Sequence, residues 1–208
     1  MDISILIASV LAASPPILFA VLGETITEKA GVINLSLDGS MLLTALVGFI
    51  VALHADSVIL GFCASMVVGA LIAWIIAFVS LTLHQPQVAT GFVLTLLSRD
   101  LAYVLGNPYA HVPGPQVSHT PIPGLVHLPV IGPILFDQNP VVYLSFLAIF
   151  LVWSYMYKTR SGLNLQGLGE RPPAAFVRGV NVTVMRYVYT LVGGALVGLG
   201  GASFSLMV

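Results

Sequence analysis

The pair Arg99-Asp100 is the feature of this chain best suited to chemistry, because it interrupts the apolar stretch 88–106. Ionisable side chains within a membrane span are costly, and by default they mark a functional site. Adjacent residues of a helix point about 100° apart, so the two side chains need not pair with each other. Contact with a solute, a break in the span, and pairing with other helices all remain open for Arg99 and Asp100.

A second candidate lies between Gly31 and Gly39, where Asn34, Ser36 and Asp38 alternate with Ile and Leu. Polar groups beside glycine breaks are typical of irregular backbone that lines a cavity at membrane depth. Asn34 and Asp38 are therefore candidates for a pathway through the membrane. A polar cytoplasmic loop accounts for the charges just before this stretch, which are Glu24, Glu28 and Lys29.

Histidines recur every eight residues at His111, His119 and His127, a spacing that suggests a metal site. The segment 107–139 that holds them also contains seven prolines, which favour an extended chain. In such a chain, at about 3.1 Å per residue, successive histidines would lie about 25 Å apart. We therefore expect a stiff extracytoplasmic loop and no bound metal.

Other chemistry has no visible carrier in the sequence. No G-x-x-x-x-G-K-[ST] phosphate loop, H-E-x-x-H or G-x-S-x-G motif is present. The single cysteine, Cys63, excludes an internal disulfide. The net charge of −1 and the lack of a basic tail give no sign of nucleic-acid binding. We expect neither an enzyme nor a bound cofactor.

Composition identifies the elements that must position these residues. Hydrophobic residues make up 58% of the chain and charged residues 7%, too few charges to cover a soluble globule. Long aliphatic runs predict an all-α, polytopic transmembrane helix bundle. Ser14-Pro15-Pro16 predicts a kink or break in the first run. The apolar runs are about 3–22, 40–54, 58–83, 88–106, 140–157 and 187–208.

The orientation follows from the basic residues. Five of the seven Lys and Arg residues lie in 158–186, which the positive-inside rule places in the cytoplasm. The loop 107–139, without Lys or Arg, then lies outside. The final run is still apolar at Val208, so we expect residues 1–208 to be part of a larger transmembrane domain.

The cytoplasmic segment contains a predicted short helix. Pro172 and Pro173 suit a first turn, Gly179 suits a helix end, and Asn181 suits the cap of the next helix. A helix of about seven residues is not stable alone in water, so it must lean on something. It is either an ordinary turn or a docking helix for a soluble partner. The candidate docking residues are Glu170, Arg171, Ala174, Ala175, Phe176, Arg178 and Gly179.

Small residues at Gly194, Gly198 and Ala202 fall on one face of the last helix. Such a row lets a neighbouring helix approach closely, so we predict a packing role there.

Several spaced motifs together resemble one family, the ABC-transporter permeases for nucleosides and simple sugars. The run G-V-I-N-L-S-L-D-G (31–39) resembles the family's A-G-V-V-N-I-G-L-E-G signature. The run G-E-R-P-P-A-A (169–175), followed by G-V-N-V (179–182), is similar to its G-E-N-P-R-A-A…G-I-N-V coupling segment. Two further stretches fit as well, Q-P-Q-V-A-T-G (85–91) and V-P-G-P…P-I-P-G-L (112–125).

The resemblance implies a permease subunit of the bacterial inner (plasma) membrane, surrounded by lipid. Its partners would be ABC ATPase subunits that use the ATP, a second permease (the same or a sister chain) and an extracytoplasmic solute-binding protein. Segment 158–186 would be the coupling loop, with Glu170 to Arg178 in a groove of the ATPase. Transport would proceed by alternating access.

Departures from the family pattern leave alternatives. Asp38 replaces the usual Glu, while Arg171 and Pro173 stand where Asn and Arg are usual. Arg99-Asp100 falls where the family is small and apolar, so substrate preference can differ. A related branched-chain amino acid ABC permease is one alternative, and an ion-coupled secondary carrier that uses Arg99 and Asp100 is another.

Overall fold

The computed structural model describes residues 3–120 and 132–207, and the regular secondary structure there is entirely helical. The predicted all-α bundle is thus confirmed. Three short turns are π-helical or 3₁₀: η1 (Phe78–Thr82), η2 (Asn107–Tyr109) and η3 (Gly132–Phe136). The α-helices are α1 (Ile3–Ala12), α2 (Pro15–Lys29), α3 (Leu37–Ala55), α4 (Val58–Ala77), α5 (Gln87–Gly106), α6 (Pro140–Lys158), α7 (Arg160–Glu170), α8 (Pro172–Val177) and α9 (Val182–Leu206).

Five of the described helical stretches are long and apolar enough to cross a membrane, and α1 with α2 would make a sixth. α1 and α2 meet at an angle of 46°. The predicted break occurs at Ser14, and Pro15 and Pro16 open α2, where a missing N–H leaves no hydrogen bond unmade.

α2 corrects the prediction of a polar loop at residues 23–29. The helix continues to Lys29, so Glu24 and Glu28 lie on its last turns. The segment 158–186 is also more ordered than a loop, since α7, α8 and the first turn of α9 occupy most of it. The low hydropathy of both segments predicted loops. Both are instead polar helical turns at the end of the bundle.

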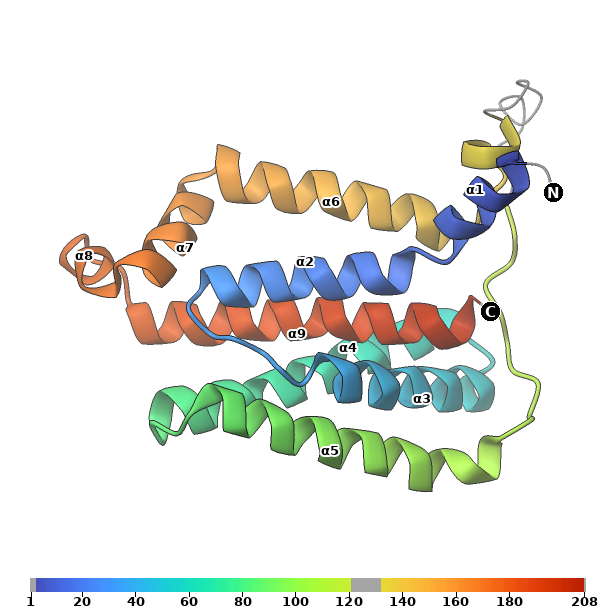
Figure 1. Ribbon diagram of the computed structural model, residues 1–208, viewed down its shortest axis with the longest axis horizontal. Coiled ribbons are helices and arrows are strands. Elements are labelled where there is room, and N and C mark those ends of the chain that lie inside the picture. The colour runs from blue at the N-terminus through green and yellow to red at the C-terminus, as the bar shows by residue number, and fades with distance from the viewer. Residues whose placement is uncertain (1–2, 121–131, 208) are drawn as a thin grey trace.

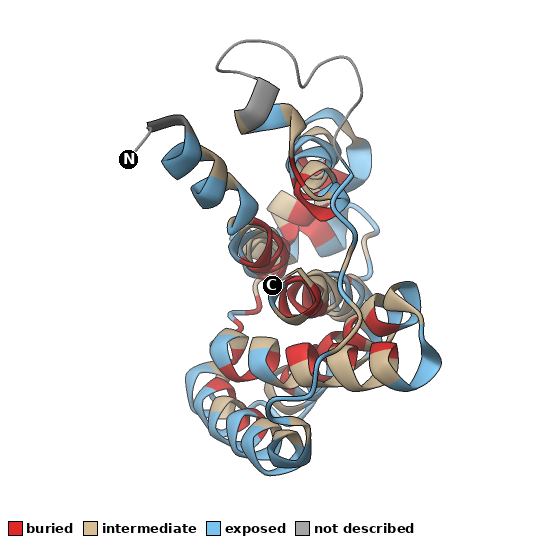
Figure 2. Ribbon diagram, turned by 90° about the vertical axis from the view of Figure 1, so that its right-hand side faces the viewer, coloured by how far each residue is buried: buried red, intermediate tan, exposed pale blue. Residues whose placement is uncertain are grey.

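α9 is the central helix, and it packs against α2, α3 and α4 (Figure 1). Figure 2 shows the buried residues gathered around it, while α5 is exposed along most of its length. α6 lies on the far side of α2 and joins α7 and α8 at the end that carries the basic residues (Figure 1).

Glycines bring the backbones of α9 and its neighbours together. A Cβ on Gly194 would lie 2.5 Å from the carbonyl oxygen of Gly69 on α4, and one on Gly198 would collide with the carbonyl oxygen of Ser65. On a second row, a Cβ on Gly193 would lie 2.6 Å from the carbonyl oxygen of Gly23 on α2. Close backbone contact of this kind is the usual basis of helix packing in lipid.

Residues 110–120 cross the other end of the bundle. The backbone N–H of Val117 donates to the carbonyl of Leu206 at the end of α9 (2.9 Å), and Asn139 Nδ2 donates to the Val117 carbonyl (3.1 Å). His119 Nε2 lies 2.6 Å from Asp137 Oδ1. The described residues contain no group of three metal-ligating side chains, and His127 lies outside them.

The glycine contacts predict an asymmetry between two Gly→Ala changes. Gly198→Ala places a methyl group against the Ser65 carbonyl and forces α4 away from α9. Gly167→Ala, in α7, meets no atom within 4 Å and should be neutral or stabilising by up to about 1 kcal/mol. Thermal unfolding of the detergent-solubilised chain should show a melting temperature several degrees lower for Gly198→Ala only. Equal melting temperatures for both variants would contradict the packing of α4 on α9.

Candidate functional site

The first candidate site is the hairpin of α7 and α8. Thr159 starts α7, since its Oγ1 accepts a hydrogen bond from the N–H of Gly162 (3.0 Å). Arg171 separates the two helices with a non-helical backbone, and Pro172 opens α8. Gly179 has a φ of +81°, and its N–H donates to the carbonyl of Phe176 (2.9 Å), which ends α8 as its sequence predicted.

α8 has a buried side and an exposed side. Ala175 is buried against a cluster that includes Leu165 and Leu168 of α7 and Ile26 of α2. Phe176 and Val177 are 71% and 85% exposed. A six-residue helix is thereby held in place from one side and presents a large apolar surface on the other.

Charged groups flank this surface. Glu170, Arg171 and Arg178 are exposed and line a recess of about 170 Å³ together with Ala174. Among the described residues these three charges form no ion pair with one another. The predicted docking residues thus lie together around α8, while their role in binding an ATPase stays a prediction.

The hairpin rests on the end of α2. A Cβ on Gly169 would lie 2.5 Å from the carbonyl oxygen of Lys29, so α7 contacts the backbone of α2 directly. Gln166 Nε2 donates to the carbonyl of Met156 at the end of α6 (2.8 Å). Displacement of α8 would therefore be felt at the ends of both α2 and α6.

The second candidate site is the non-helical stretch 30–36 between α2 and α3. Glu24 holds it from α2, because its Oε1 accepts the N–H of Asn34 (3.0 Å) and its Oε2 accepts the hydroxyl of Thr27 (2.9 Å). The amide oxygen of Asn34 accepts both the N–H (3.0 Å) and the hydroxyl (2.7 Å) of Ser36. These bonds satisfy backbone and side-chain groups that have no access to water.

α5 holds the same stretch from the other side. Gln87 Oε1 accepts the N–H of Ile33 (2.9 Å), and the Thr95 hydroxyl donates to the carbonyl of Leu35 (2.9 Å). A Cβ on Gly91 would lie 2.8 Å from the Cβ of Leu35. Two stretches that carry the family resemblance, 31–39 and 85–91, are therefore in direct contact.

Asn34 and Asp38 differ in their surroundings. Asn34 is 2% exposed and its amide oxygen is occupied, whereas Asp38 is exposed in the first turn of α3. A pathway role for either residue stays a prediction. The sequence missed Glu24 as an anchor of this stretch, because the like-charged residue Glu28 one turn later is typical of a solvated segment.

Arg99 and Asp100 lie on the exposed side of α5. They line a groove of about 500 Å³ with Leu42 and Leu46 of α3 and Tyr103. Within the described part of the chain, neither side chain forms an ion pair or a hydrogen bond. Pairing with another helix of the same chain is therefore not observed among these residues.

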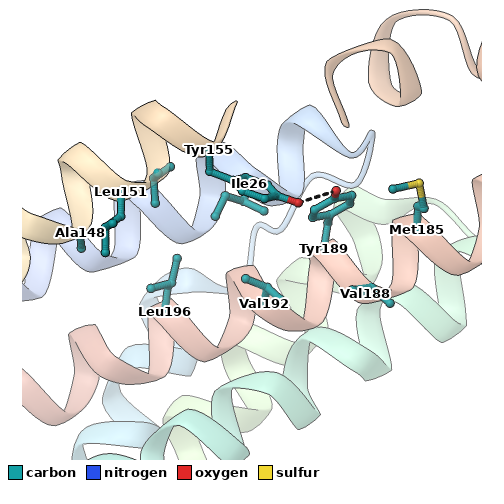
Figure 3. A pocket seen from close by; sticks show the side chains of 10 residues that line it. Ile26, Ala148, Leu151, Tyr155, Met185, Val188, Tyr189, Val192 and Leu196 are labelled. Carbon is teal, nitrogen blue, oxygen red and sulfur yellow. Dashed lines mark hydrogen bonds between the residues drawn. The ribbon is translucent and has the colours of Figure 1, made fainter. Parts of the chain in front are cut away.

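An apolar cavity of about 690 Å³ separates α6 from α9 (Figure 3). Leu151 and Tyr155 of α6 face Tyr189 and Val192 of α9 across it, and Ile26 of α2 also lines it. A hydrogen bond between the hydroxyls of Tyr155 and Tyr189 (2.9 Å) closes the end near α7.

The fold and these sites define a polytopic α-helical membrane protein with a short helical hairpin at one end of its bundle. Over residues 6–208 the chain matches the family described as "Branched-chain amino acid transport system / permease component", and it belongs to that family. The family resemblance drawn from the motifs is thus confirmed. The chain is accordingly a multi-pass protein of the inner (plasma) membrane.

Three curated relatives are similar over most of the chain. "Putative glucose ABC transporter permease protein TsgC13" of Haloferax volcanii is 37% identical over 93% of this chain. "Nucleoside ABC transporter permease protein NupC" of Lactococcus lactis and "Guanosine ABC transporter permease protein NupQ" of Bacillus subtilis are 29% and 30% identical over 98%. The chain spans 60%, 68% and 67% of their respective lengths. No solved structure matches it.

The bonds to Glu24 predict that Glu24→Ala destabilises the bundle more than Glu28→Ala does. The first change leaves the N–H of Asn34 without its acceptor, at a cost of about 1–3 kcal/mol, while the hydroxyl of Thr27 keeps the backbone carbonyl of residue 24. Glu28 is exposed and serves as the matched control. Melting temperatures in detergent, with proteolysis at 30–36 as a local readout, distinguish the two. Unchanged proteolysis in Glu24→Ala would show that Glu24 does not hold this stretch.

Proposed function

We propose that this chain is part of the transmembrane permease of an ATP-binding cassette importer that moves a nucleoside or a simple sugar by alternating access. The observation that carries the proposal is α8, a short helix anchored through Ala175 that presents Phe176 and Val177 beyond the bundle. Apolar side chains this exposed on a helix anchored from one side suit a docking partner. The ATPase of an importer is the partner that family membership favours.

A continuous set of contacts leads from α8 into the membrane. α8 packs on α7, and α7 touches the backbone of α2 at Lys29. One turn earlier, Glu24 of α2 holds Asn34, and the same stretch is bonded to α5 through Gln87. Movement of α8 by an ATPase would thereby reorient α2 and α5 together, which is the coupling that alternating access requires.

Family membership also supports the other partners of the proposed importer. Because the chain has no phosphate loop, ATP would be bound and hydrolysed by separate ATPase subunits. A second permease, the same or a sister chain, would complete the pathway, and an extracytoplasmic binding protein would deliver the solute. No cofactor is proposed for this chain.

The relatives support the solute class. Two are named for a nucleoside or guanosine and one for glucose, while the family description names branched-chain amino acids. We favour nucleosides or simple sugars because the relatives similar over 93–98% of this chain carry those names. A branched-chain amino acid permease is the second candidate, on the family description alone.

Co-purification tests the proposal. The reading frame that encodes this chain would be expressed with the genes that flank it, purified on a tag, and assayed for ATP hydrolysis with and without nucleosides, sugars and branched-chain amino acids. We expect an ATPase to co-purify and its turnover to rise with nucleosides or sugars in the presence of the binding protein. A chain that purifies without any ATPase, and whose transport follows an ion gradient, would overturn the proposal.

Docking through α8 predicts that Phe176→Asp reduces the amount of ATPase that co-purifies by about tenfold or more, because a charge replaces an exposed apolar contact. Ala174→Asp, on the same surface, and Glu170→Ala should weaken association as well. Val112→Asp, an exposed position in the loop at the opposite end, is the control and should leave association intact. Equal co-purification with Phe176→Asp and Val112→Asp would rule out docking through α8.

A further inference from the structure

Arg186, in the second turn of α9, lies directly against Gly31 at the end of α2. A Cβ built on Gly31 would lie 3.0 Å from Nη2 of Arg186 and 3.5 Å from both its Cζ and its Nε, so the guanidinium group covers the place where a side chain would begin. Gly31 has a φ of +83°, a backbone conformation that favours glycine, and its N–H donates to the carbonyl of Glu28 (2.9 Å). The glycine therefore both ends α2 and leaves room for Arg186.

The guanidinium group is held in this place by packing and by the end of α2. Among the described residues, no oxygen accepts the buried Nε of Arg186, and no carboxylate lies within ion-pair distance of the side chain. The C-terminal end of α2 favours a cation there, because its last carbonyl groups carry a partial negative charge. Since this attraction has no fixed geometry, Arg186 can stay on Gly31 while α9 and α2 shift against each other.

The same turns of α9 are joined to α8. Met185, the residue before Arg186, packs against the buried cluster that holds Ala175 of α8. Asn181 caps α9, since its Oδ1 accepts the N–H of Val184 (3.1 Å). Because α9 follows α8 after a short connection, displacement of α8 would move the first turns of α9 and with them Arg186.

Gly31 extends this contact to the stretch 30–36 and to α5. Its carbonyl accepts a hydrogen bond from Gln87 Nε2 (3.4 Å), and Gln87 Oε1 accepts the N–H of Ile33. Arg186, Gly31 and Gln87 thus form a series of contacts from the start of α9 across 30–36 to α5. This series does not pass through α7, so it is a second connection between α8 and the polar stretch.

We propose that Arg186 is a positioning residue of the transport cycle: by resting on Gly31, it makes the stretch 30–36 follow the start of α9 when α8 moves. The inference rests on the proposed function and names a side chain that regulates its coupling. Hydrogen exchange of the protein without its ATPase reads the contact itself, whereas transport per ATP reads its use. The inference and the proposed function can therefore fail separately.

Hydrogen exchange tests the connection in the purified full-length protein. Asn181→Ala removes the cap of α9, and we expect the amides of 30–36 to exchange about fivefold faster, because Arg186 then holds Gly31 less firmly. Arg186→Ala should speed the same amides, and adding Asn181→Ala to it should change nothing further. Arg160→Ala, at an exposed arginine of α7, is the matched control and should leave these amides unchanged.

Two results of this experiment would overturn the proposal. One is normal exchange at 30–36 in Asn181→Ala, a variant that keeps Arg186 and so remains informative even if Arg186→Ala does not fold. The other is an additive effect of the two changes, because residues that act through one contact do not add.

Transport per ATP tests the use of this contact in the complex with the ATPase. In proteoliposomes with the binding protein and labelled guanosine or glucose outside, Arg186→Ala should carry about tenfold less solute for each ATP hydrolysed, with the amount of bound ATPase unchanged. Arg186→Lys keeps a cation at the end of α2 and should recover part of this loss, which general destabilisation would not explain. Arg160→Ala should behave as the unaltered protein.

Equal transport per ATP in Arg186→Ala and in the unaltered protein would overturn the proposal. An unaltered protein that binds no ATPase would overturn the proposed function alone, and the exchange experiment would still decide whether Arg186 links α9 to 30–36.

Discussion

Direct contact between helix backbones in an apolar solvent is the constraint on which the rest of this structure depends. Lipid gives helices no hydrophobic reason to associate, so α9 is held by close packing at Gly193, Gly194 and Gly198. These contacts fix α2 on one side of α9 and α4 on the other. Because α8 leads into α9 through residues 178–181 alone, the proposed docking surface is tied to the centre of the bundle.

The second constraint is that polar backbone inside the bundle must be satisfied without water. The stretch 30–36 meets it with acceptors from two helices, the Glu24 carboxylate on α2 and the Gln87 amide on α5. A side effect of this solution is that a non-helical segment joins α2, α3 and α5. Such a joint, next to the hairpin of α7 and α8, is well placed to convert movement at the membrane surface into movement of the spans.

Hydropathy and local signals predicted much of this fold. Proline placed the break at Ser14, the basic segment marked one end, and Pro172, Gly179 and Asn181 marked the limits of α8 and the start of α9. These signals for helix ends and breaks are local, so they can be recognised from neighbouring residues in the sequence. Gln87 and Thr95 were missed because their partners lie 54 and 60 positions away in the chain. α7 was missed because its apolar positions, Leu165 and Leu168, are few and lie in a polar segment.

The central claim is that movement of solute is driven by ATP through a partner docked on this chain. Uptake into proteoliposomes that contain the complete complex tests it most directly, with ATP enclosed or absent and labelled guanosine or glucose outside. The account predicts accumulation against a gradient only with hydrolysable ATP and the binding protein, unchanged when ionophores collapse ion gradients. Accumulation without ATP, abolished by ionophores, would contradict it and assign Arg99 and Asp100 to an ion-coupled carrier.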